Sequence, residues 1–179
     1  MSPVVLPYPV PLCVTVLAIV AASTDITSRR IPNRIVALGL AGALIAQCAL
    51  HGIQAGALEW MAGAATGFGL LLPFYLLRGM AAGDVKLMLA IGAWVGAQTT
   101  LYIVLATFVA GGVGALIVAL MQGRMRRMWA NVRMLVAGRV RGSRTGASGE
   151  PVPVVSVGTL PYGVAIAAGT LGVVFASCA

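Results

Sequence analysis

The chain has 179 residues, of which 60% are hydrophobic and only 9% are charged. Its mean hydropathy is +0.99, whereas about 25% of the residues in a typical soluble domain are charged. This composition excludes an ordinary soluble protein and indicates an integral membrane protein whose first partner is the lipid bilayer. The net charge of +8 does not indicate a nucleic-acid partner, because the cytoplasmic loops of membrane proteins collect Lys and Arg.

The N-terminal segment predicts a first membrane span. A helix is expected to begin near Pro9 or Pro11, since proline is tolerated in a first turn. The apolar run reaches only about Thr24, which is short against the ~20 residues of a crossing, so the helix should continue to or past Asp25. Residues 1–24 contain no Lys or Arg. A secretory signal begins with basic residues, so we expect this span to be retained.

A polar loop with three arginines follows at 25–34. Pro32 disfavours helix at the residue before it, and Asn33 is expected to cap the next helix. The second and third spans are expected at about 35–50 and 57–77. Glu59, near the start of the third span, is favourably placed for the dipole of that helix.

Three more spans are expected, at about 85–98, 100–121 and 160–176. Between the last two, the segment 123–158 holds seven of the eleven arginines. Met, Trp, Val and Leu recur at helical spacing over 125–136, opposite arginines. This pattern predicts an amphipathic helix that lies in the membrane interface.

The sequence therefore predicts an all-α membrane protein, a polytopic bundle of six transmembrane helices. The loops after the first, third and fifth spans carry all the Lys and Arg, and those after the second and fourth carry none. The positive-inside rule places both termini outside, Asp25 and Asp84 on the cytoplasmic face, and His51 on the other face. We expect one membrane domain over 1–179, with 123–158 as a basic cytoplasmic loop within it.

The four acidic residues are the main candidates for chemistry: Asp25, Glu59, Asp84 and Glu150. A carboxylate at an apolar boundary is costly and commonly functional. Two carboxylates on one face can share a proton, so that one activates water and the other acts as an acid. The sequence does not assign these two roles. It also leaves open that Asp84 is a helix N-cap and that Asp25 pairs with Arg29 at (i, i+4).

Other catalytic and metal centres have less support. The lone His51 lies on the wrong face for a Ser-His-Asp arrangement. The three cysteines are isolated and no C-x-x-C pair exists, so we expect no metal site and no cofactor. A dyad of Ser28 as nucleophile and Lys86 as base is conceivable, although no local motif supports it.

Three motifs together resemble the prepilin peptidases, also known as type IV leader peptidases. They are the D-x5-I-P-N pattern of 25–33, Gly83-Asp84-Val85-Lys86-Leu87, and Pro161-Tyr162-Gly163. The resemblance covers nearly the whole chain. It implies a GxGD membrane aspartic protease that cuts a basic leader from prepilins at the cytoplasmic face of the bacterial inner membrane. It further implies that Asp25 and Asp84 are the catalytic pair and that four residues belong to the active-site loops: Pro32, Asn33, Gly83 and Lys86.

The chain departs from the family pattern in two ways. Ala81 stands where the first glycine of G-x-G-D is expected, which affects the geometry of the loop. No cytosolic insertion with paired C-x-x-C motifs lies between the first span and Asp25. The chain therefore resembles the compact form that serves Tad-type (Flp) pili, and we expect no methyltransferase activity.

The resemblance also predicts a prepilin or pseudopilin substrate. An acidic residue of that substrate, just after the cut, is expected to contact Arg29, Arg30 or Lys86. Two other functions stay open: a small proton-coupled transporter, and a non-catalytic subunit of a pilus or secretion assembly. A transporter would be expected to hold its acids near the bilayer centre, whereas Asp25 and Asp84 are predicted at one edge.

Overall fold

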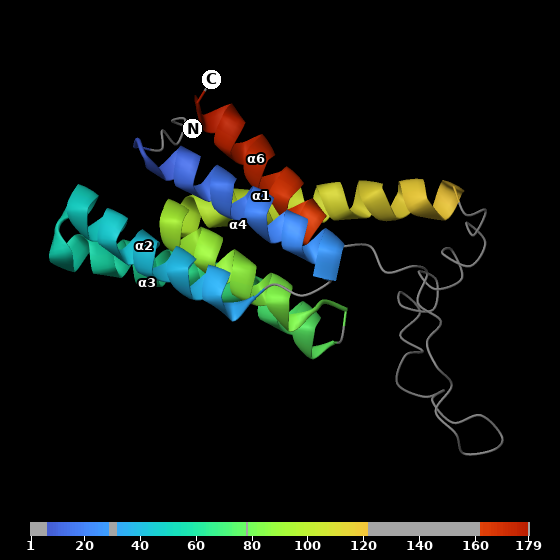
Figure 1. Cartoon of the computed structure of the whole chain (residues 1–179), viewed down its shortest axis with the longest axis horizontal. Helices are drawn as coiled ribbons and strands as arrows, with labels where there is room; N and C mark the ends of the chain where they lie inside the picture. The colour runs from blue at the N-terminus through green and yellow to red at the C-terminus, as the bar shows by residue number, and fades with distance from the viewer. Residues whose placement is uncertain (1–6, 29–31, 78, 122–161, 179) are drawn as a thin grey trace, which may run out of the picture. The chain divides into compact units, whose positions relative to one another are not determined.

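The computed structural model describes residues 7–28, 32–77, 79–121 and 162–178. These residues form five α-helices and no strand: α1 (Val10–Ser28), α2 (Asn33–His51), α3 (Ile53–Leu76), α4 (Ala82–Met121) and α6 (Tyr162–Cys178) (Figure 1). The first four are long and apolar enough to cross a membrane, and α6 is apolar but shorter. The chain is thus an all-helical, multi-pass membrane protein, as its composition predicts.

Helix α1 extends past Asp25, as its length requires. Its last two turns are rich in hydroxyl side chains that donate to carbonyls of the same helix. Ser23 Oγ donates to Ile19 O at 2.8 Å, and Thr27 Oγ1 donates to Ser23 O at 2.9 Å. Because these hydroxyls are satisfied locally, the helix can carry polar residues to its end. Asp25 therefore lies in the last turn of a continuous helix.

The turn between α2 and α3 is tighter than the sequence predicts. The spans predicted at 35–50 and 57–77 leave a linker of several residues between them, but Gly52 alone separates the two helices. Gly52 has a φ of 84°, in the region that favours glycine, and its carbonyl accepts the Gly56 N–H at 2.8 Å. The prediction that the third span begins near 57 is therefore wrong by about one turn.

The predicted N-cap of the second helix is also wrong, and an interpretation of Asp84 that the sequence left open is excluded. The N-cap of α2 is Pro32, which has an extended backbone, and Asn33 is the first helical residue. Helix α4 begins at Ala82, so Asp84 lies inside its first turn, where its N–H donates to Ala81 O at 3.2 Å. The interpretation of Asp84 as a helix cap does not hold.

The predicted fourth and fifth spans form one element, α4, broken at Gly96. This glycine has φ 77° and ψ 171°, so α4 consists of two helical segments, 82–95 and 97–121. Thr100 Oγ1 donates to Gly96 O at 2.6 Å in the first turn after the break. The break falls slightly before the expected gap at 98–100, because glycine alone tolerates this backbone conformation at little cost.

Segment 82–95 lies at the centre of the core. Leu87, Met88 and Ile91 are fully buried. Helix α3 packs against this segment through backbone contacts of Gly63 with Gly92 and of Gly67 with Met88. Small residues let helices approach closely where hydrocarbon offers no hydrophobic drive for association.

The remaining helices surround this segment in pairs. Helix α2 packs against α3, and α1 packs against α6 (Figure 1). The Trp60 indole N–H donates to Leu40 O at 3.0 Å, which joins α3 to α2. Trp60 is thus half-buried between helices, where the sequence alone suggests an interfacial aromatic residue.

The chain divides into two compact units, 1–111 with 161–179, and 112–160. The described part of the second unit, 112–121, is the end of α4. The predicted interfacial helix of 125–136, the rest of the 123–158 loop, Arg29 and Arg30 lie outside the described residues.

The close contact of α3 with segment 82–95 predicts that alanine substitutions at two glycines of α3 differ strongly in their effect on stability. A Cβ at Gly63 would overlap the backbone of Gly92, whereas a Cβ at Gly69 would have nothing within 4 Å. We expect Gly63→Ala to destabilise the protein by about 1–3 kcal/mol, because the helices must separate. Gly69→Ala is the matched control and should leave stability unchanged. Thermal unfolding in one detergent measures both, and equal melting temperatures would contradict this packing.

Candidate active site

Four helix ends meet at one end of the first unit (Figure 1). They are the C-terminal end of α1 and the N-terminal ends of α2, α4 and α6. Two side-chain hydrogen bonds join them in pairs, from α6 to α1 and from α4 to α2. Both aspartates singled out by the sequence lie at this end, on α1 and α4.

Asp25 is held by the start of α6. The backbone N–H of Gly163 donates to Asp25 Oδ2 at 2.9 Å. The first N–H groups of a helix have no partner within the helix, and the positive end of the helix dipole favours a carboxylate there. The N-terminus of α6 therefore fixes the position of the Asp25 side chain.

Only glycine fits at position 163. A Cβ there would lie 2.7 Å from Asp25 Oδ2 and 3.0 Å from its Cγ. Any side chain would push the Asp25 carboxylate away from the helix N-terminus. The Tyr162-Gly163 pair of the third sequence motif thus lies directly against the first motif, 138 positions away in the chain.

Asp84 is 5% exposed and is followed in α4 by the equally buried Val85. It lies close enough to Asp25 for the charge of Asp25 to act on it. The charge of Asp84 in turn acts on the phenol of Tyr162. One carboxylate is therefore enclosed by protein, and the other, on α1, is half-buried beside it.

Lys86 connects the second motif to the first. It is exposed, two residues beyond Asp84, and its Nζ donates to Asn33 Oδ1 at 3.1 Å. The contact joins the N-terminal ends of α4 and α2. Sequence reasoning placed both residues in motifs but missed the pairing, because no local pattern shows which loops meet.

The remaining predicted residues are placed as follows. Pro32 precedes α2 and is exposed, and Gly83 is half-buried next to Asp84. Ala81 is exposed and accepts the Asp84 N–H, so its methyl group is accommodated. Ser28 Oγ donates to Thr24 O at 2.7 Å, and Lys86 Nζ donates to Asn33 Oδ1 at 3.1 Å.

His51 and Glu59 line a cavity at the Gly96 break and not the aspartate site. This agrees with the predicted separation of His51 from the two aspartates. Within the described ranges, no group of three His, Cys, Asp or Glu side chains could hold a metal ion. The chemistry available at the aspartate site is that of two carboxylates, a lysine, a phenol and free helix N–H groups.

Comparison with known proteins identifies the family. Residues 12–116 match the model of the type IV leader peptidase family. The match covers more than half of the chain and includes four of the site residues: Asp25, Asn33, Asp84 and Lys86. Helix α6, which holds Asp25 in place, lies beyond its end. No curated protein and no solved structure matches the chain.

Proposed function

The chain belongs to the type IV leader peptidase family, and we propose that it is an aspartic endopeptidase that removes the basic leader from prepilins. The family makes the chain a peptidase. The aspartic mechanism rests on one observation: helix ends from distant parts of the sequence bring Asp25 against the Gly163 N–H and within electrostatic reach of the buried Asp84.

The two carboxylates have different surroundings, and this suggests their roles. Asp25 is only half-buried and accepts a backbone hydrogen bond from Gly163 at the N-terminal end of α6. Asp84 is almost fully enclosed, and burial disfavours a second charge beside the first. We therefore assign the negative charge to Asp25 and the shared proton to Asp84.

Peptide hydrolysis follows from this assignment. Asp25 takes a proton from a water molecule as the water oxygen attacks the carbonyl carbon of the scissile bond. Asp84 gives its proton to the carbonyl oxygen, which would otherwise carry a full negative charge. In the collapse of the tetrahedral gem-diol, one of its hydroxyl groups returns a proton to Asp84, the C–N bond breaks, and the proton on Asp25 passes to the leaving amine, which restores both carboxyl groups to their starting state.

The substrate is proposed to be a prepilin or pseudopilin, which carries a basic leader before an apolar helix. That helix would lie in the bilayer beside α1 and α4, whose ends carry the two aspartates. This places the scissile bond at the membrane boundary. Arg29 and Arg30 are proposed to contact an acidic residue of the substrate just after the cut, and Lys86 lies on the same end of the protein.

Six membrane crossings are proposed, with the site on the cytoplasmic face of the bacterial inner membrane. Gly111, after the Gly96 break, is again next to Tyr162 at the aspartate end. The two segments of α4 therefore run in opposite directions between the two ends. With α1, α2, α3 and α6 they make six alternating segments, and the loop charges orient them with both termini outside.

The remaining proposals concern the subtype. We propose a single membrane peptidase domain over 1–179, with 123–158 as its basic cytoplasmic loop. The chain passes from α1 to Asn33 with no room for an inserted domain. It fits the compact form that serves Tad-type (Flp) pili, without methyltransferase activity.

The carboxylate pair predicts that each aspartate is essential. We expect Asp25→Asn and Asp84→Asn each to lower the rate of prepilin cleavage by on the order of 10³-fold or more, since general acid–base catalysis contributes up to about 10⁴-fold. Co-expression with a prepilin, scored by the mobility shift of the cleaved product, measures this. Thr27→Val is the matched control, because Thr27 is exposed and its hydroxyl donates only to carbonyls of α1. Full cleavage by either Asn variant would contradict the mechanism.

The Gly163 contact predicts a positioning effect. Gly163→Ala should displace the Asp25 carboxylate and lower kcat by about 10–100-fold, with a smaller change in KM, because displacements near 1 Å cost that much. Gly172→Ala is the control on the same helix, since a Cβ there has nothing within 4 Å. If Gly163→Ala and Gly172→Ala cleave equally fast, Gly163 does not position the base.

The substrate contact predicts a charge effect. Reversing Arg29, Arg30 and Lys86 together to Glu should raise KM by about tenfold, which corresponds to about 1.4 kcal/mol of binding. A prepilin whose acidic residue after the cut is changed to Lys should recover part of this loss. Unchanged cleavage by the triple variant would rule the contact out.

A further inference from the structure

The phenol of Tyr162 lies in the aspartate site and has no role in the hydrolysis proposed above. Tyr162 is the first residue of α6 and precedes Gly163, whose N–H holds the Asp25 carboxylate. The charge of Asp84 acts on the phenol. Tyr162 is thus next in the chain to the residue that holds one carboxylate and within electrostatic reach of the other.

The tyrosine ring is held in place by its apolar surface. It is half-buried and packs against the hydrophobic core. At the end of the ring that carries the hydroxyl, Cε2 and Cζ would lie 3.4 and 3.7 Å from a Cβ at Gly111. This end of the ring therefore reaches from α6 to segment 97–121 of α4, where Gly111 leaves room for it.

The Tyr162 hydroxyl is free to contact a ligand. Within the described part of the chain it makes no hydrogen bond, and it is not one of the fully enclosed polar atoms there. A tyrosine hydroxyl is protonated at neutral pH and can donate one hydrogen bond. Two other donors of the site already have acceptors: Lys86 donates to Asn33, and the Gly163 N–H donates to Asp25.

The proposed reaction has a place for such a donor. As water attacks, negative charge develops on the oxygen of the scissile carbonyl, the atom that Asp84 protonates. A carbonyl oxygen has two lone pairs, so it can receive the Asp84 proton and accept a second hydrogen bond. A donor that is already in position where the charge develops stabilises the transition state without reorganisation.

We propose that Tyr162 is a third catalytic residue, whose hydroxyl donates a hydrogen bond to the oxygen of the scissile carbonyl. The inference rests on the proposed aspartic peptidase function. The phenol keeps its proton throughout, because Asp84 supplies the proton that the oxygen receives. Contact of the ring with Gly111 holds the phenol in position before the substrate arrives.

Steady-state cleavage of a prepilin by the purified full chain in detergent tests the proposal. Tyr162→Phe removes only the hydroxyl and keeps the ring against Gly111. We expect kcat to fall by about 100-fold, the loss typical of removing one donor to a developing oxyanion. KM should stay nearly unchanged, because the hydrogen bond is strongest in the transition state. Tm should also stay unchanged, since the apolar contacts of the ring remain.

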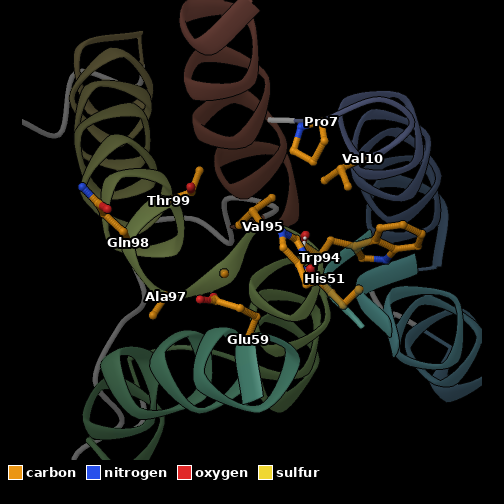
Figure 2. Close-up of a pocket in the computed structure, with 11 residues that line it drawn as sticks. Pro7, Val10, His51, Glu59, Trp94, Val95, Ala97, Gln98 and Thr99 are labelled. Carbon is orange, nitrogen blue, oxygen red and sulfur yellow. Dashed lines mark hydrogen bonds between the residues drawn. The ribbon is translucent and has the colours of Figure 1, made fainter. Parts of the chain in front are cut away.

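Tyr102→Phe is the matched control. Tyr102 is also half-buried, and it lies in segment 97–121 near the Gly96 break. At that break, Gln98 and Thr99 line a cavity whose wall includes neither aspartate (Figure 2). Removing the Tyr102 hydroxyl should therefore leave kcat and KM at their wild-type values.

The possible results separate this inference from the proposed function. If Asp84→Asn is inactive but Tyr162→Phe cleaves as fast as Tyr102→Phe, the phenol is not catalytic and the peptidase assignment stands. A higher KM with an unchanged kcat, or a fall in Tm in parallel with the loss of activity, also overturns the proposal. Failure of the unmodified protein to cleave any prepilin contradicts the proposed function and this inference with it.

Discussion

The hydrogen bond from the Gly163 N–H to Asp25 Oδ2 is the contact on which the site depends. It joins the last turn of α1 to the first turn of α6, across most of the length of the chain. A carboxylate at a helix N-terminus satisfies a free backbone donor and meets a favourable dipole. The same contact requires a glycine on α6, because a Cβ would overlap the carboxylate.

Glycine backbones set the rest of the architecture. Gly52 turns the chain from α2 directly into α3, and Gly96 turns it between the two segments of α4. Close contact of Gly63 with Gly92 then holds α3 against the segment that carries Asp84. These turns and contacts bring helix ends together, so that acids from different helices lie at one end of the first unit. At the opposite end, Gly96 lies in the wall of a cavity that Gln47 and Glu59 also line.

The sequence predicts the membrane fold and the family, but it does not predict the turns and the contacts between distant parts of the chain. Composition predicts the helical membrane fold, and span length places Asp25 inside α1. Motifs identify the family that the comparison confirms. The single-residue turn at Gly52, the position of the break at Gly96 and the Asn33–Lys86 bond were not predicted, since backbone reversals and contacts between distant loops depend on tertiary approach.

Proximity of the two aspartates is the central claim, and cysteine cross-linking tests it most directly. Cys13, Cys48 and Cys178 are first replaced by Ala, and Asp25→Cys with Asp84→Cys is then treated with a short bifunctional maleimide. We expect this pair to be linked within one molecule, as seen by mass spectrometry. Asp25→Cys with Glu59→Cys, at opposite ends of the helices, should stay unlinked. Equal linking of both pairs, or none of the first, would contradict the account.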